Sequence, residues 1–319
     1  MKVLRVVLLT VVLSLFFTSA AQAAWVGSLK QFRVPTADSA PRAITVGSDG
    51  NLWFTESSEN LPAQIGRLTP SGDFTEFPIE CNFCILTDIV QGPDDVLYFT
   101  SNEDELGRIT TDGTVLPAVP LPENDVLAGQ LAVFGDDVWI TDFNNNSVWR
   151  YDIPTDTFTQ YVAPTPASSP FGIAVDAAGI VWFTESGASS IGRLDPATGV
   201  ITEIPTASPA RDIAVATDGQ IWFTSRFTPQ SVSRLNPVTG GITTFAVSGG
   251  PESIAASPDG SLWFVQATRG GIARITNDGV ITEAKAVRGS DPFGITVDAA
   301  GNPWYTMMSA NKIAQLQLR

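Results

Sequence analysis

The sequence predicts an all-β fold, a seven-bladed β-propeller, and two observations lead to that prediction. A Trp-Phe-like dipeptide recurs at nearly constant intervals, and short β-branched and aromatic segments alternate with Asp, Asn, Gly and Pro turns. The aromatic residues that begin the dipeptides are Trp53, Tyr98, Trp139, Trp182, Trp222, Trp263 and Trp304, spaced by 45, 41, 43, 40, 41 and 41 residues. Repeats of about 40 to 50 residues with four strands each are typical of propeller blades.

Each repeat predicts four strands in the same order. In the fourth repeat these are an apolar strand at Gly172–Val175, the tryptophan strand, a third strand at Ile191–Leu194 and a fourth at Val200–Ile204. The segments between them, such as Asp-Pro-Ala-Thr-Gly, are turn sequences, and no segment keeps a helical period. Six of the eight tryptophans occupy the repeated position, which predicts that they form the core between blades.

The ends of the chain predict how the ring closes. The last repeat stops at its third strand, Ile313–Leu316, whereas Leu29–Val34 precedes the first repeat and resembles a fourth strand. We expect these two segments to pair and complete the last blade, because pairing removes a sheet edge that would otherwise be exposed.

Residues 1–23 predict a secretory signal peptide, and residues 24–319 a single propeller domain. Lys2 and Arg5 precede an apolar run at Val6–Phe17, and small residues ending in Ala21-Gln22-Ala23 follow. The apolar run is too short for a membrane span, which needs about 20 residues. We therefore expect a secreted or periplasmic protein with no membrane contact after signal cleavage.

Composition excludes several classes of function. The chain has 18 Lys and Arg against 33 Asp and Glu, a net charge of −15, which repels nucleic acid. It contains no histidine, so Ser-His-Asp and Cys-His catalysis and His metal ligands are excluded. No P-loop, EF-hand or HExxH motif is present. We expect a monomer whose partner is a small molecule, a carbohydrate or a peptide.

Cys81 and Cys84 are the two cysteines of the chain. In an exported protein this spacing favours a local disulfide at the connection into the second blade. A redox pair and half of a metal site remain alternatives.

Two rings of positions are expected at the mouth of the central channel, where propeller loops gather on one face. One ring ends the aromatic strands and the other precedes the first apolar strands. From them we select six ligand-binding candidates, Arg42, Glu56, Asp142, Glu185, Arg211 and Glu252. Glu56, Glu185 and Glu252 are also candidates to bind a divalent metal such as magnesium or calcium, because carboxylates are the ligands that these ions prefer.

The units DGNLWFTE…IGRLTPSGDFTEF and DAAGIVWFTESGASSIGRLDPATGVITEIPT resemble those of the virginiamycin B lyase (streptogramin lyase) family of seven-bladed propellers. The resemblance covers all seven repeats. It implies a lyase that opens a cyclic depsipeptide antibiotic by elimination, with a bound magnesium ion. It also implies a histidine after the proline that opens each of the last two blades, a glutamate two residues before the second histidine, and a glutamate ending the last aromatic strand.

This chain departs from the implied site at each of its four positions. Glu252 and Phe293 stand where histidines are implied, Asp291 and Met307 where glutamates are implied. Asp291 retains a carboxylate and joins the ligand-binding candidates, whereas the catalytic residues stay unassigned.

The sequence leaves two hypotheses about function. The first is an exported binding or interaction module without streptogramin lyase activity. The second is a divergent metal-dependent lyase or lactonase-like hydrolase with a carboxylate site on the channel face.

Overall fold

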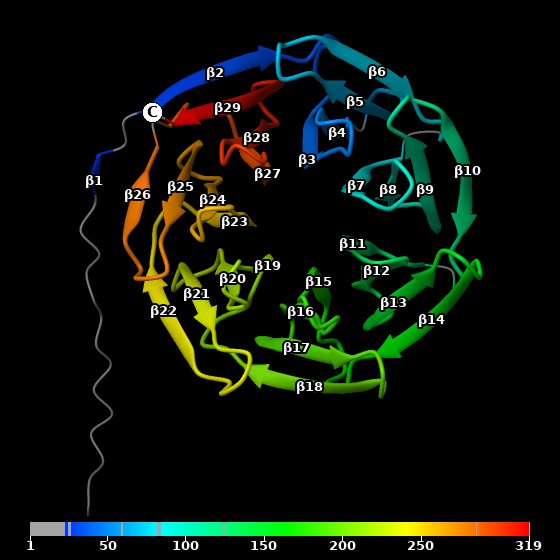
Figure 1. Cartoon of the computed structure of the whole chain (residues 1–319), viewed down its shortest axis with the longest axis vertical. Helices are drawn as coiled ribbons and strands as arrows, with labels where there is room; N and C mark the ends of the chain where they lie inside the picture. Colours follow the sequence, from blue (N-terminus) through cyan, green and yellow to red (C-terminus); the bar gives the residue numbers. More distant parts are fainter. Residues whose placement is uncertain are drawn as a thin grey trace, which may run out of the picture.

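The seven repeats fold into seven antiparallel sheets arranged in a ring (Figure 1). The computed structural model describes residues 23–24, 27–58, 60–81, 84–123, 125–284 and 286–318. The predicted signal peptide, residues 1–23, lies outside the described residues apart from Ala23. Within those residues, no helix has the length and hydrophobicity that crossing a bilayer would require.

The four strands of each blade run from the channel to the rim. The inner strands are β3 (Pro41–Val46), β7 (Leu86–Gln91), β11 (Ala128–Phe134), β15 (Pro170–Val175), β19 (Ile213–Val215), β23 (Pro251–Ala256) and β27 (Pro292–Val297). The second strands are β4 (Leu52–Glu56), β8 (Val96–Ser101), β12 (Asp137–Asp142), β16 (Val181–Glu185), β20 (Ile221–Ser225), β24 (Leu262–Gln266) and β28 (Pro303–Met307). The third strands are β5 (Gln64–Leu68), β9 (Glu105–Thr110), β13 (Ser147–Asp152), β17 (Ser190–Asp195), β21 (Ser231–Leu235), β25 (Gly271–Ile275) and β29 (Lys312–Leu318). The outer strands are β6 (Phe74–Pro78), β10 (Val115–Pro120), β14 (Thr157–Val162), β18 (Val200–Pro205), β22 (Ile242–Ala246), β26 (Ile281–Glu283) and β2 (Gly27–Arg33).

The predicted ring closure is confirmed. Strand β2 pairs antiparallel with β29 from Gly27 opposite Leu318 to Arg33 opposite Lys312, and becomes the outer strand of the seventh blade. The ring of Phe32 stacks on Trp304, with centroids 5.7 Å apart. An additional short strand, β1 (Ala23–Ala24), pairs parallel with β26 at the outer edge of the sixth blade (Figure 1).

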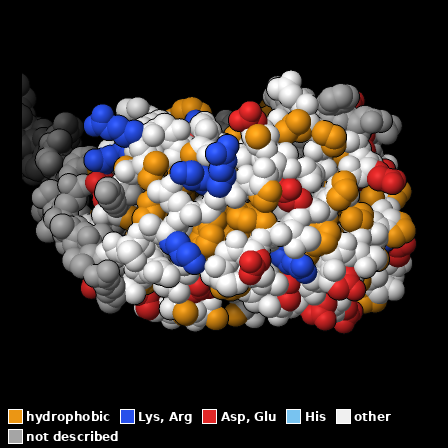
Figure 2. All heavy atoms as spheres, turned by 90° about the horizontal axis from the view of Figure 1, so that it is seen from above, with side chains coloured by type: hydrophobic (Ala, Val, Ile, Leu, Met, Phe, Trp, Pro, Cys, Tyr) orange, Lys and Arg blue, Asp and Glu red, His pale blue; other side chains and the backbone are white. Residues whose placement is uncertain are grey.

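Among the residues that the structure describes, the core lies between the blades and forms seven clusters of buried residues. Trp182 of the fourth blade is 1% exposed and packs in one cluster with Ile213 and Phe223 of the fifth blade. The other five tryptophans of the repeated position are at most 1% exposed. The repeated aromatic residue is therefore a core residue, as predicted. Figure 2 shows that charged side chains of both signs and apolar side chains are mixed over one side of the ring.

The threonine that follows the Trp-Phe-like pair links the inner strands of adjacent blades in four of the seven blades. The Thr184 hydroxyl accepts a hydrogen bond from the Gly172 N–H of its own blade at 2.8 Å and donates to the Arg211 carbonyl of the next at 3.0 Å. Equivalent pairs of bonds are made by Thr141, Thr224 and Thr306. Val265 occupies this position in the sixth blade. The Trp-Phe-Thr repeat thus supplies both the core and the link between adjacent inner strands.

Replacing Thr184 with valine is expected to lower the free energy of unfolding by about 1–3 kcal/mol, because the buried N–H and C=O groups lose their shared partner. Urea unfolding of the variant measures the loss. Thr159→Val, at an exposed position of β14, is the matched control and should leave stability unchanged. Equal stability of both variants would show that the threonine link contributes nothing.

Candidate functional site

A cavity of about 350 Å³ occupies the channel and is lined by the inner-strand regions of all seven blades. One aliphatic residue from each blade lines the cavity, and every member of this aliphatic ring is less than 9% exposed; the residues are Ile44, Ile89, Leu131, Ile173, Ile213, Ile254 and Ile295. The polar and aromatic lining residues precede this ring and lie toward the face that carries the blade connections. Phe143 and Leu127, 38% and 39% exposed, extend the lining at that end.

A register shift in the inner strands directs these side chains toward the channel. In the first blade it falls between Pro41 and Ile44, and in the seventh between Pro292 and Ile295. Four further inner strands, β7, β11, β15 and β23, have a shift near their starts. Irregularities of this kind change where a side chain points and leave a backbone N–H unpaired by the ladder. The residues inside the shift are therefore those that meet at the mouth.

Glu252 lies between two arginines. Its carboxylate accepts a hydrogen bond from Arg211 Nε at 2.6 Å and forms an ion pair with Arg226 Nη1 at 2.9 Å. Glu252 is 2% exposed, so both arginines compensate a buried charge. The guanidinium of Arg211 also lies 3.5 Å from the centroid of the Phe171 ring. This arrangement holds Glu252 in a fixed ion pair.

Arg42 is the second arginine that lines the cavity, and its contacts differ from those of Arg211. Its guanidinium lies 4.7 Å from the centroid of the Phe293 ring, and within the described residues it makes no hydrogen bond or ion pair with another side chain. Burial lowers the pKa of Arg42, followed by the positive charge of Arg211. The side chain is half-buried and faces the cavity.

Sequence reasoning missed two aspartates in the cavity lining, Asp88 and Asp212. Asp88 accepts a hydrogen bond from the Leu131 N–H at 2.8 Å, and Asp212 accepts one from the Ile254 N–H at 2.8 Å. Each carboxylate thus binds an N–H that the register shift of the next blade leaves free. Burial raises the pKa of Asp88 to about 7 and that of Asp212 to about 6. An acidic residue directly before the apolar anchor of an inner strand was the available signal.

The structure separates the predicted mouth residues into two groups. Arg42 and Arg211 line the cavity and Glu252 contacts Arg211, whereas the expectation that Glu56, Asp142 and Glu185 line the mouth is wrong. The three are at most 2% exposed, because neighbouring turns and blade connections cover the ends of their strands.

Asp142 and Glu185 are each bound within their own blade. Asp142 accepts hydrogen bonds from the Asn145 side chain at 2.9 Å and from the Trp149 ring at 3.2 Å. Glu185 accepts one from Ser190 at 2.8 Å. They are therefore structural groups of the third and fourth blades.

A metal site shared by Glu56, Glu185 and Glu252 does not form. The three belong to the first, fourth and sixth blades, and in the described ranges no group of three or more Asp, Glu, Cys or His side chains is placed to hold a metal ion. The physical reason is that Glu56 and Glu185 end the second strands of the first and fourth blades, whereas Glu252 lies on the inner strand of the sixth.

The four positions of the implied lyase site do not fit a magnesium ion either. The Phe293 ring lies against the Arg42 guanidinium and has no atom that could bind a metal ion, and the Met307 side chain is fully buried. Asp291 is exposed, lies outside the cavity lining and has a left-handed backbone with φ of 48°. Glu252, the remaining carboxylate, is held by two arginines. No step through a bound magnesium ion follows from these residues.

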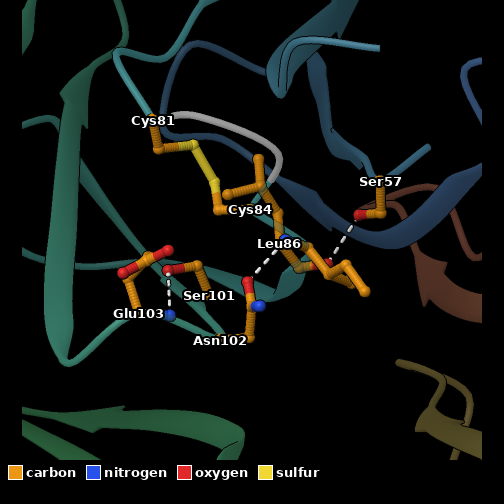
Figure 3. Close-up of a disulfide and its surroundings, with 8 residues drawn as sticks. Ser57, Cys81, Cys84, Leu86, Ser101, Asn102 and Glu103 are labelled. Atoms are coloured by element: carbon orange, nitrogen blue, oxygen red, sulfur yellow. Dashed lines mark hydrogen bonds between the residues drawn. A yellow bond between two sulfur atoms is a disulfide. The ribbon is translucent and has the colours of Figure 1, made fainter. Parts of the chain in front are cut away.

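Cys81 and Cys84 are joined by a disulfide at the entry to the second blade (Figure 3). The segment that follows is fixed by two hydrogen bonds. Asn102 Oδ1 accepts one from the Ile85 N–H, and Ser57 donates one to the Leu86 carbonyl, both at 2.6 Å. The disulfide borders a separate groove between the first two blades and lines no part of the channel cavity.

The chain is similar to virginiamycin B and streptogramin B lyases. The model of the virginiamycin B lyase family matches residues 15–152 and 130–319. Virginiamycin B lyase from Nocardia farcinica (strain IFM 10152) is 32% identical over 221 residues, which cover 65% of this chain and 72% of that protein.

Two solved structures extend this similarity to the fold. A streptogramin B lyase is 27% identical, with a TM-score of 0.83 over 93% of this chain and 100% of its own. A catalytically inactive His-to-Ala variant of virginiamycin B lyase from Staphylococcus aureus, solved with quinupristin, is 26% identical, with a TM-score of 0.83 over 92% of this chain and 100% of its own. The repeats, the closed seven-bladed ring and these matches show that this chain belongs to the virginiamycin B lyase family.

Proposed function

We propose that this protein is an exported, monomeric propeller that binds a small molecule, carbohydrate or peptide at the channel mouth and does not open streptogramins. One observation carries the proposal: the four positions of the implied lyase site hold an arginine-bound glutamate, a phenylalanine, an exposed aspartate and a buried methionine. Export is inferred from the signal-peptide features of residues 1–23.

Elimination needs a base to remove a proton and a group to stabilise the negative charge that develops. The family resemblance assigns these roles to histidines and a magnesium ion. In the Staphylococcus aureus relative, a single His-to-Ala variant is catalytically inactive, and this chain has no histidine. Phe293 and Met307 lack any titratable group, so neither replaces the missing base. This chain therefore keeps the propeller fold of the family but lacks the residues that the implied lyase reaction uses.

Asp88 and Asp212 favour a second candidate, a carboxylate-based hydrolase or lyase. Their pKa values of about 7 and about 6 are suited to a general base near neutral pH. However, both carboxylates accept backbone N–H groups of the next blade, which ties them to the scaffold. A structural role explains both their position and their burial, so binding remains the better-supported function.

The purified protein is expected to leave a type B streptogramin intact in magnesium buffer, because the channel face lacks the implied base and metal ligands. Mass spectrometry of the reaction measures ring opening, with the Nocardia farcinica lyase as the positive control. Calorimetric titration with magnesium, calcium and manganese should give no heat of binding. Chelator-sensitive turnover above the uncatalysed rate would contradict the proposed loss of lyase activity.

A further inference from the structure

Arg42 presents a guanidinium to the channel without an acceptor among the described residues. Its Nε is buried and has no hydrogen-bond partner. Buried donors are nearly always paired, because an unmade hydrogen bond leaves the desolvation cost of the group uncompensated. An arginine that lines a cavity and lacks an acceptor is therefore positioned to bind a group that enters the cavity.

The carboxylates near Arg42 already have other partners. Glu252 accepts a hydrogen bond from Arg211 and forms an ion pair with Arg226, while Asp88 and Asp212 accept backbone N–H groups. Each of these acceptors has a partner other than Arg42. The missing partner of Arg42 is thus an anion or another strong acceptor supplied from outside the protein.

The surroundings of Arg42 are flat and apolar. Arg42 stacks on Phe293 of the preceding blade, and Arg211 stacks on Phe171 of its own preceding blade. Phe143 and Leu127 are partly exposed at the same mouth. A cavity of about 350 Å³ has the size of a small-ligand site. An inorganic anion alone would leave these apolar walls unused.

We propose that the ligand of the channel mouth is a small organic carboxylate with a flat, apolar body. Its carboxylate pairs with Arg42, for which the guanidinium offers two parallel N–H donors, and its body packs among Phe143, Phe171 and Phe293. The proposal rests on the proposed binding function, which it narrows to one chemical class.

Calorimetric titration of the purified protein with phenylacetate, phenylacetamide and inorganic phosphate tests the class. Phenylacetate and its amide have nearly the same shape and differ in charge, whereas phosphate is an anion without an apolar body. A hydrogen bond to a charged group corresponds to an affinity difference of about ten- to hundredfold. We expect phenylacetate to bind at least about tenfold more tightly than each of the others. Equal binding of acid and amide, or preferred binding of phosphate, would overturn the proposal.

Arg42→Gln tests the residue, and Arg193→Gln is the matched control. Arg193 lies on β17 and contacts the Trp182 ring, away from the cavity lining. We expect Arg42→Gln to abolish the preference for the acid over the amide and Arg193→Gln to retain it. Thermal unfolding checks that each variant is folded, and the comparison of probes on the unchanged protein does not depend on either variant. A preference that persists in folded Arg42→Gln would contradict the assignment.

The two proposals fail in different ways. If no probe binds and streptogramin stays intact, the carboxylate assignment is wrong while a binding function without lyase activity stands. If streptogramin is linearised, the proposed function is wrong, whatever the probes do.

Discussion

Replacing Asn311 with alanine is expected to lower the free energy of unfolding by about 2–4 kcal/mol and to release the closing strand β2. Asn311 is 8% exposed, and its Oδ1 accepts hydrogen bonds from the N–H and the hydroxyl of Ser39, both at 3.0 Å. Its Nδ2 donates to the carbonyls of Val34 and Thr36 at 3.3 and 2.8 Å. Alanine leaves these buried groups unpaired and is also strained at a φ of 53°.

Asn146 provides a matched control in the third blade. Its Oδ1 accepts from the Ser168 N–H and hydroxyl at 2.6 and 2.9 Å, and its Nδ2 donates to the carbonyls of Ala163 and Thr165 at 3.2 and 2.9 Å. The two asparagines thus make the same bonds, but only Asn311 attaches the segment that follows β2 to the C-terminal blade. Asn146→Ala should cost similar stability without affecting β2.

Urea unfolding measures the loss of stability, and amide hydrogen exchange at residues 27–33 measures the release of the strand. Exchange reports local opening even where the rest of the ring stays folded. We expect faster exchange at residues 27–33 in Asn311→Ala and unchanged exchange there in Asn146→Ala. Identical exchange in both variants would show that strand pairing alone holds the closure.

The propeller fold could be predicted from the sequence because the patterns that indicate it lie within single repeats. The aromatic anchors, the turn sequences and the short β-branched runs can be counted along the chain, and each corresponds to a strand or turn of the structure. Closure was also predictable, because a repeat that lacks its last strand and a leading segment that resembles one are both visible in sequence order.

The site was less predictable because it depends on contacts between residues of different blades, which are far apart in sequence. Glu56 stands at the end of its strand, where the sequence predicts a residue of the channel mouth. The preceding blade connection, which includes Ser39, covers it. The pairing of Arg42 with Phe293 joins the first blade to the last. Neither contact leaves a periodic pattern in the sequence. Residue type and position placed Arg42 and Arg211 in the cavity lining, but they could not distinguish a covered carboxylate from an open one.

Glu56 and Glu185 each lie beside a second carboxylate in a buried network. Glu76, next to Glu56, accepts hydrogen bonds from the Thr36 N–H and hydroxyl at 2.9 and 3.0 Å. Burial, followed by the charge of Glu76, raises the pKa of Glu56 to about 8. Burial also raises the pKa of Glu185, and the charge of Glu203 adds to that effect. The pair of Glu56 and Glu76 is therefore expected to hold one proton at neutral pH.

The sixth blade contains a version of this pair that needs no proton. Gln266 stands at the position of Glu56, and its Nε2 donates a hydrogen bond to Glu283 Oε1 at 3.1 Å. The amide thus supplies the donor that a protonated glutamate would supply in the first and fourth blades. Glutamine in place of Glu56 or Glu185 should accordingly keep the network intact at every pH.

The double variant Glu56→Gln with Glu185→Gln is expected to be more stable than the unchanged protein by about 2–4 kcal/mol at pH 9 and about equally stable at pH 5. The folded-state pKa of Glu56 exceeds the unfolded value, so its stabilising contribution is complete below pH 4.5 and is lost as the pH rises through about 8. Glutamine does not titrate, so the double variant escapes this loss between about pH 5 and 8.

Urea unfolding at a series of pH values measures this difference, and Glu105→Gln, at an exposed position of β9, is the control. The control removes one negative charge without touching either pair, so it should retain the alkaline loss of stability. An alkaline loss that is as steep in the double variant as in the unchanged protein would mean that the buried pairs do not hold a proton, and that other groups cause the pH dependence.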